Sequence, residues 1–183
     1  CVENETNLFY TQPANGILGL APLGKNKASF ISMAKEKGLI DKEIFSICFD
    51  VSGGYITFGG FNTKYHNGGI QYIPYSAGNM YKVTLSSYQI ANDETKSISS
   101  SFYTVIDSGT TLTYLPSSLA KEILTGIKSY CNRNNFCYAT YSSGCFKPNN
   151  GVSRIDVIRN LPNIYLLLGD IRMIWESKNY VTN

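Results

Sequence analysis

The sequence carries little charge, and what charge it has is scattered. Only 16% of its 183 residues are Asp, Glu, Lys or Arg, and the formal net charge is +3 at pH 7. The lysines and arginines form no run that could follow a phosphate backbone, so nothing in the sequence supports nucleic-acid binding. No apolar stretch approaches the roughly 18 residues that a membrane-spanning helix needs. We therefore expect no membrane contact from this segment.

Histidine is nearly absent, which weakens the case for a metal site. The single histidine, His66, is remote in the sequence from the cysteines. The gaps between the cysteines are wider than the Cys-x2-Cys spacing typical of zinc ligands. A zinc site is thus the less favoured explanation of the cysteines, and we expect no metal and no cofactor.

The cysteines instead favour disulfides. There are five, of which the last three are clustered: Cys1, Cys48, Cys131, Cys137 and Cys145. Such clustering suggests an oxidising compartment, although the sequence leaves the pairing open. The odd number leaves one cysteine without a partner, which a longer protein would explain. Asn4-Glu5-Thr6 is an N-glycosylation sequon and supports a secretory route. No signal peptide opens the chain, so its start at Cys1 points to processing or truncation.

Most of the chain is expected to form strands. Tyrosine is abundant, with 14 copies, and Ser, Thr, Gly and Asn are frequent, a mix that favours strands and turns. Paired glycines such as Gly53-Gly54 divide residues 43–75 into a predicted β meander that ends with Ile70-Gln71-Tyr72-Ile73-Pro74. The alternation from Tyr81 to Ile90 predicts a half-buried strand.

Fewer segments have helical periodicity. Residues 29–37 have apolar residues at helical spacing before Gly38, a typical C-cap. A second helix is predicted to begin at Pro116. Residues 131–153 are expected to form a hairpin or loop, and residues 164–168 and 171–175 two strands. The glycine-flanked run from Gly16 to Leu20 is compatible with a buried strand.

The most informative stretch is residues 105–116. Val105-Ile106 lead into Asp107, and Ser108, Gly109 and two threonines follow. A carboxylate at the end of an apolar strand is costly to bury unless small donors surround it. These neighbours supply hydroxyl groups and a flexible backbone, as a reactive carboxylate would need. The alternative is an Asp-Ser-Gly turn that only closes a strand.

Taken together, these segments resemble the pepsin-like aspartic proteases. The segments that resemble family motifs occur in the same order as in the family: residues 15–20, 38–40, 44–46, 53–60, 105–111 and 161–164. The resemblance extends over nearly the whole chain. Residues 105–111 are similar to the second catalytic motif, Asp-Thr-Gly or Asp-Ser-Gly. Each motif alone is weak, but their order and spacing are specific.

The resemblance implies a mostly β, pepsin-like acid protease fold with few short helices. Residues 1–60 would be the end of the N-terminal lobe with inter-lobe strands. Residues 61–183 would be the C-terminal catalytic lobe, lacking its last strands. The first Asp-Thr-Gly and the tyrosine-bearing flap would precede Cys1, so we expect a fragment that is inactive alone. The missing N-terminal lobe would then be its partner.

The resemblance also implies roles for individual residues. Asp107 would be one of two catalytic aspartates of an endopeptidase, which activate a water molecule between them. Ser108 would help to lock the active-site loops, Gly109 would let the substrate backbone approach, and Thr110 would donate to Asp107. An extended polypeptide substrate would contact further residues by their side chains: Val105, Tyr114, Leu8 and Ile17. Core burial is an equal alternative for Leu8 and Ile17.

Subfamily and location follow less directly. Cys1, Glu5-Thr6 and the run from Leu8 to Gln12 resemble the plasmepsin V-like branch of protist proteases, with nepenthesin-like or memapsin-like enzymes as alternatives. The implied location is the secretory pathway, that is, the endoplasmic reticulum, a vacuole or the exterior.

The sequence leaves two other functions open. One is a catalytically inactive relative that acts as a binding protein or inhibitor. The other is a structural domain with an incidental Asp-Ser-Gly. The presence of Asp107 disfavours the inactive relative, and the order of the motifs disfavours the structural domain.

Overall fold

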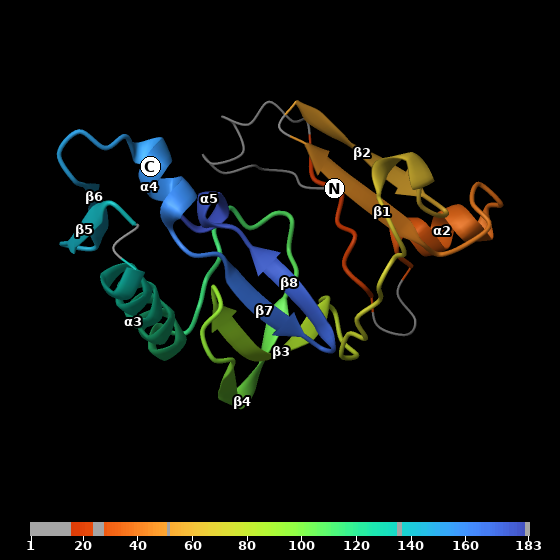
Figure 1. Cartoon of the computed structure of the whole chain (residues 1–183). Coiled ribbons are helices and arrows are strands. Elements are labelled where there is room, and N and C mark those ends of the chain that lie inside the picture. Colours follow the sequence, from red (N-terminus) through yellow and green to blue (C-terminus); the bar gives the residue numbers. More distant parts are fainter. Residues whose placement is uncertain (1–15, 24–27, 51, 135–136, 182–183) are drawn as a thin grey trace. The chain divides into compact units, whose positions relative to one another are not determined.

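The computed structural model describes residues 16–23, 28–50, 52–134 and 137–181 (Figure 1). The chain divides into two compact units, one made of residues 1–69 with 78–80 and the other of residues 70–77 with 81–183. We call them the first and the second unit. This division into units does not test the lobe boundary expected at residue 60, which stays a prediction.

In the described residues of the first unit, we find one helix, one hairpin and a short 3-10 helix. Its described elements are α2 (Phe30–Glu36), β1 (Phe45–Asp50), β2 (Gly53–Phe58) and η1 (Thr63–Tyr65). β1 and β2 pair antiparallel, with Phe45 opposite Phe58 and Asp50 opposite Gly53. Gly54 is required in this hairpin because a Cβ there would lie 2.6 Å from the carbonyl oxygen of Cys48. The predicted helix and the first two strands of the meander are therefore confirmed.

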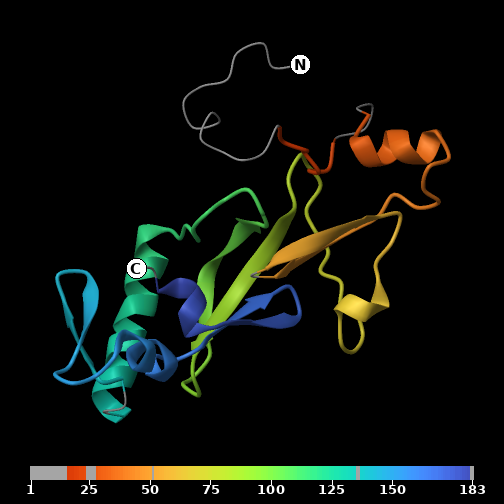
Figure 2. The ribbon, with the colours of Figure 1, turned by 90° about the horizontal axis from the view of Figure 1, so that it is seen from above.

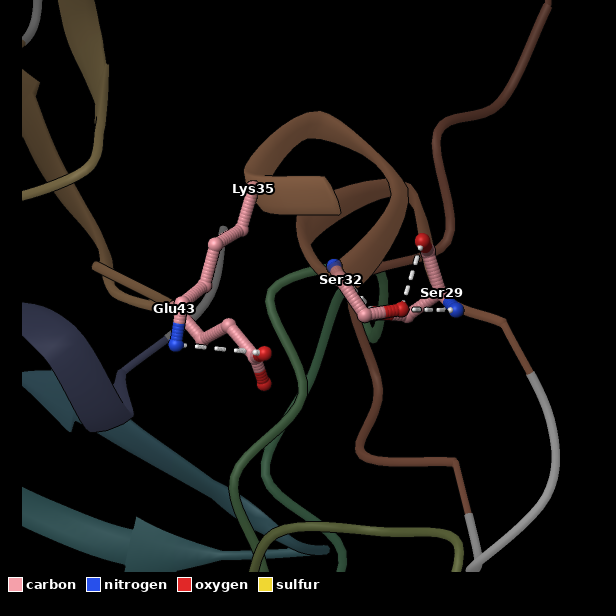
Figure 3. A network of polar contacts seen from close by, with 4 residues as sticks. All are labelled: Ser29, Ser32, Lys35 and Glu43. Carbon is pink, nitrogen blue, oxygen red and sulfur yellow. Dashed lines mark hydrogen bonds and ion pairs between the residues drawn. The ribbon is translucent and has the colours of Figure 1, made fainter. Parts of the chain in front are cut away.

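Helix α2 is bounded by local sequence signals. The Ser29 hydroxyl accepts from the Ser32 N–H at 3.0 Å, and the Ser32 hydroxyl accepts from the Ser29 N–H at 2.8 Å (Figure 3). This reciprocal pair satisfies N–H groups that the first helical turn would leave free. Gly38 follows the helix with φ +68°. Lys35 and Glu43 approach to 3.7 Å (Figure 3) but are half exposed, so their attraction contributes little.

One predicted strand, at residues 70–74, is wrong, and the strand considered as an alternative for residues 16–20 is not formed either. Residues 70–75 form no strand, and only Ser76 makes an isolated bridge, to Lys82. Pro74 lacks the N–H that a ladder needs. Residues 16–20 also form no strand, and Ile17 is 73% exposed among the described residues.

The second unit is built on a four-stranded antiparallel sheet in the order β4-β3-β7-β8 (Figures 1 and 2). The bounds of the elements in this unit are β3 (Lys82–Ile90), β4 (Lys96–Val105), α3 (Ser117–Asn134), β5 (Ala139–Ser142), β6 (Cys145–Pro148), α4 (Arg154–Asn160), β7 (Ile164–Leu168), β8 (Ile171–Trp175) and α5 (Ser177–Tyr180). The strands predicted from Tyr81, Ile164 and Ile171 are confirmed. β4, which leads into Asp107, begins at Lys96.

One face of this sheet holds the core. Helix α3 lies alongside the sheet (Figure 2) and contributes one apolar side chain per turn. The buried cluster includes Val83, Leu85, Tyr88, Ile90, Leu119, Ile123, Ile127, Cys131, Ile164, Leu166 and Leu168. A Cβ at Gly126 would lie 2.2 Å from Cδ1 of Ile90, so glycine lets α3 approach β3 closely. This packing supports β3, and β3 in turn supports β4 and the segment that follows it.

The cysteine cluster forms the predicted hairpin and one disulfide. Cys131, in α3, is bonded to Cys137, which precedes the β5-β6 hairpin. Cys48 and Cys145 form no disulfide with any described residue. Cys1 and the sequon at Asn4 lie outside the described residues.

Candidate active site

The candidate site begins where β4 ends. The pairing of β3 with β4 reaches Lys82 opposite Val105. One residue further, the Ile106 N–H donates to the Tyr81 carbonyl oxygen at 3.0 Å. Asp107 comes next and opens a turn of residues 107–110, which we call the Asp107 turn. The Thr110 N–H donates back to the Asp107 carbonyl oxygen at 3.3 Å.

Both oxygens of the Asp107 carboxylate accept hydrogen bonds within this turn. The Gly109 N–H donates to Oδ1 at 2.9 Å, and the Thr110 hydroxyl donates to Oδ2 at 2.5 Å. A carboxylate has about four acceptor positions, so further positions remain for water or a substrate group. The turn therefore orients the carboxylate while leaving acceptor capacity unused.

These donors also favour the ionised form of Asp107. The hydrogen bond from Thr110, followed by the one from Gly109, lowers the pKa of Asp107, and slight desolvation acts in the opposite direction. No charged group of the described residues contributes to the shift. Asp107 is exposed, so the donors orient a solvated carboxylate rather than compensate for burial.

At Gly109, a side chain would crowd the Asp107 carboxylate. A Cβ there would lie 3.3 Å from Oδ1 of Asp107. Glycine keeps this oxygen at hydrogen-bond distance from the Gly109 N–H without that crowding. Ser108, between the two, is exposed.

The structure brings four of the predicted site residues together and leaves others apart. Asp107, Ser108, Gly109 and Thr110 make up the Asp107 turn. Val105 and Tyr114 flank it and are 42% and 78% exposed. Ile17 belongs to the first unit, and Leu8 lies outside the described residues.

The sequence does not identify Tyr81, whose backbone contacts the residue that precedes Asp107. The Tyr81 carbonyl oxygen holds the backbone just before the aspartate. No sequence signal points to this role, because every residue has a carbonyl group and only strand pairing decides which one is used.

Within the described part of the chain, no group of three or more His, Cys, Asp and Glu side chains is placed to hold a metal ion. None of the described helices is both long and apolar enough to cross a bilayer.

Replacing Thr110 by valine is expected to raise the pKa of Asp107 toward the ordinary value of an aspartate. The hydroxyl donates to the ionised carboxylate, so its loss disfavours ionisation. A ¹³C NMR titration of the Asp107 carboxyl carbon measures the shift. Thr111→Val is the matched control, because Thr111 makes no hydrogen bond to Asp107. Equal pKa values in the two variants would contradict the assignment.

Comparison with known proteins decides the family. The family described as "Eukaryotic aspartyl protease" matches residues 1–183. The chain belongs to this family. The resemblance inferred from the residues is thus confirmed, as is the mostly β, pepsin-like fold class.

Several curated relatives of this aspartyl protease chain are pepsins. Pepsin-3 of Oryctolagus cuniculus is 31% identical over 155 residues, which are 80% of this chain and 40% of the relative. Pepsin A of Suncus murinus is 26% identical over 182 residues, 96% of this chain and 43% of the relative. Secreted aspartic protease 8 of Candida albicans is 30% identical over 142 residues, 74% of this chain and 34% of the relative. The chain therefore spans less than half the length of these relatives.

Proposed function

We propose that the full-length protein containing these residues is an aspartic endopeptidase and that Asp107 is one of its two catalytic aspartates. The observation that carries the proposal is the Asp107 turn, in which both carboxylate oxygens are held by donors while the side chain stays open to solvent. Family membership supplies the reaction class.

The chemistry needs two carboxylates that share one proton. Two like charges so close cannot both ionise, so one aspartate stays ionised and the other protonated. The ionised aspartate accepts a proton from the attacking water, and the protonated one donates to the scissile carbonyl oxygen. The donors around Asp107 suit the ionised state. The printed sequence contains one Asp-Ser-Gly and no Asp-Thr-Gly, so the second aspartate would come from the missing N-terminal lobe.

The neighbours of Asp107 would bind and orient the substrate. Thr110 and Gly109 keep the carboxylate in place, and Ser108 is proposed to join the two active-site loops. The substrate would bind in extended form, with side chains in alternate pockets. The exposed side chains of Val105 and Tyr114 are proposed to line pockets, together with Leu8 and Ile17 from the other part of the chain.

A secretory location fits the chemistry of the cysteines. The Cys131–Cys137 disulfide is typical of proteins from oxidising compartments, and the name of one relative describes that relative as secreted. The plasmepsin V-like assignment rests on residues 1–12, outside the described residues, and remains a prediction.

The alternative is an inactive relative that kept the fold as a binding protein or inhibitor. The two functions differ in the missing lobe, where an Asp-Thr-Gly supports the enzyme and its absence supports the binding protein. The donors that orient the Asp107 carboxylate support the enzyme, and the same bonds would also stabilise an Asp-Ser-Gly turn in an inactive relative.

The proposal predicts activity in the full-length protein and none in these 183 residues alone, because one carboxylate cannot share a proton across a water molecule. Cleavage of an unfolded protein substrate, measured from acidic to neutral pH with and without pepstatin, tests both statements. Pepstatin-sensitive turnover by the 183-residue chain would refute the two-lobe requirement. A full-length protein without such turnover would favour the binding protein.

A further inference from the structure

The backbone that leads into Asp107 is held from behind by a segment outside the sheet. The Ile106 N–H donates to the Tyr81 carbonyl oxygen, which extends the β3-β4 ladder by one residue. Ile106 directly precedes Asp107. The position of the carboxylate relative to the fold therefore depends on where Tyr81 is held.

Tyr81 is held in turn by residues 73–76. The Ser76 N–H donates to the Lys82 carbonyl oxygen at 2.8 Å, so Lys82 lies between Ser76 and Val105. The ring of Tyr75 packs edge to face on the ring of Tyr81, with centroids 5.4 Å apart and an angle of 72°. Ile73 packs against the core and approaches the turn at Gly169. All these residues belong to the second unit.

Residues 105–110, at this end of the ladder, are exposed. The hydrogen bonds of the Asp107 turn are local, since they join only residues 107–110. Val105 and Ile106 are 42% and 52% exposed, so burial does little to fix them. Strand ends with few buried contacts open readily. A ring contact at the neighbouring strand is therefore well placed to limit that opening.

The ring pair keeps its character at acidic pH. Burial, and to a lesser degree the proximity of Tyr75, raises the pKa of Tyr81 above its ordinary value. The Tyr81 phenol therefore remains neutral wherever an aspartate titrates. The ring contact can act over the whole pH range in which the carboxylate changes its charge.

We propose that Tyr75, through its ring contact with Tyr81, is a positioning residue for Asp107. This inference rests on the proposed function as far as catalysis is concerned. Its structural part, that the ring pair limits opening of the Ile106–Tyr81 hydrogen bond, stands independently.

The test compares three variants of the full-length protein: Tyr75→Leu, Tyr75→Phe and Tyr72→Leu. Phenylalanine keeps the ring, whereas leucine removes it. Tyr72 lies in the same segment, is 77% exposed and makes no ring contact with a described residue, so Tyr72→Leu is the matched control. The readouts are kcat and KM on a peptide substrate, and hydrogen exchange of peptides that contain Ile106.

Tyr75→Leu is expected to lower kcat and to speed exchange at Ile106, each by about three- to tenfold, the worth of one edge-to-face ring pair. KM should stay within about twofold, because the substrate pockets remain. Tyr75→Phe and Tyr72→Leu should match the wild type in all readouts.

Three results would overturn the positioning role. These are a kcat in Tyr75→Leu no lower than in Tyr72→Leu, unchanged exchange at Ile106, or a Tyr75→Phe variant as impaired as Tyr75→Leu. A wild-type protein without pepstatin-sensitive activity would instead overturn the proposed function. In that case, hydrogen exchange at Ile106 would still show whether the ring pair limits opening of the Ile106–Tyr81 hydrogen bond.

Discussion

Replacing Asp107 by asparagine in the full-length protein is expected to lower kcat by at least about a thousandfold, within the range that general acid-base groups contribute. Asparagine has nearly the same shape, but it can neither hold a negative charge nor take up the proton of the attacking water. Initial rates of peptide cleavage at saturating substrate measure the loss.

A matched control separates this effect from a loss of charge on the surface. Asp170, in the turn between β7 and β8, is exposed and lies outside the Asp107 turn. Asp170→Asn should cleave at the wild-type rate. An Asp107→Asn variant that keeps more than a tenth of the wild-type kcat, roughly, would show that Asp107 is not part of the catalytic pair.

Leu168→Ala is expected to destabilise the second unit by about 2–5 kcal/mol, the cost of truncating a buried leucine. Leu168 is 3% exposed and pairs with Leu85 and Ile171 across the sheet. Its loss opens a cavity beneath the strand pair that carries Asp107. Urea unfolding followed by the fluorescence of Trp175, the single tryptophan of the sequence, measures the free energy of unfolding.

The neighbouring Leu167 provides the control. It is the same residue type on the same strand, but it lies on the opposite face and is only half-buried. Leu167→Ala should cost less than half as much as Leu168→Ala. Equal losses would show that the α3 face of the sheet is not the dominant core of this unit.

Elements with complete local signals could be predicted from the sequence. Helix α2 has its cap residue Ser29, its apolar spacing and its terminating Gly38 within ten residues. The β1-β2 hairpin is defined by Gly53-Gly54 between two apolar runs. In both cases the residues that start, bury and end the element are neighbours in the chain. The element can therefore be predicted without knowledge of the rest of the fold.

The wrong prediction and the unformed alternative strand have a common physical cause. Residues 70–74 and 16–20 are apolar and flanked by glycine or proline, but a strand also needs a partner backbone. Alternation and glycine spacing show which face could be buried, and they do not show what covers it. Ile17 is therefore a plausible core residue in the sequence and an exposed one in the structure.

By itself, the sequence determined the family, the mostly β class and Asp107 as the candidate catalytic residue. Motifs and short-range patterns depend only on residues that are close together in the chain, so they can be recognised without the fold. The donors to Asp107 lie two and three residues away and belong to the same local pattern. Only the tertiary structure decided that the turn is open to solvent, that Cys131 pairs with Cys137, and that Tyr81 holds the backbone before Asp107. These features depend on strand pairing and packing between residues far apart in the chain, which no local pattern specifies.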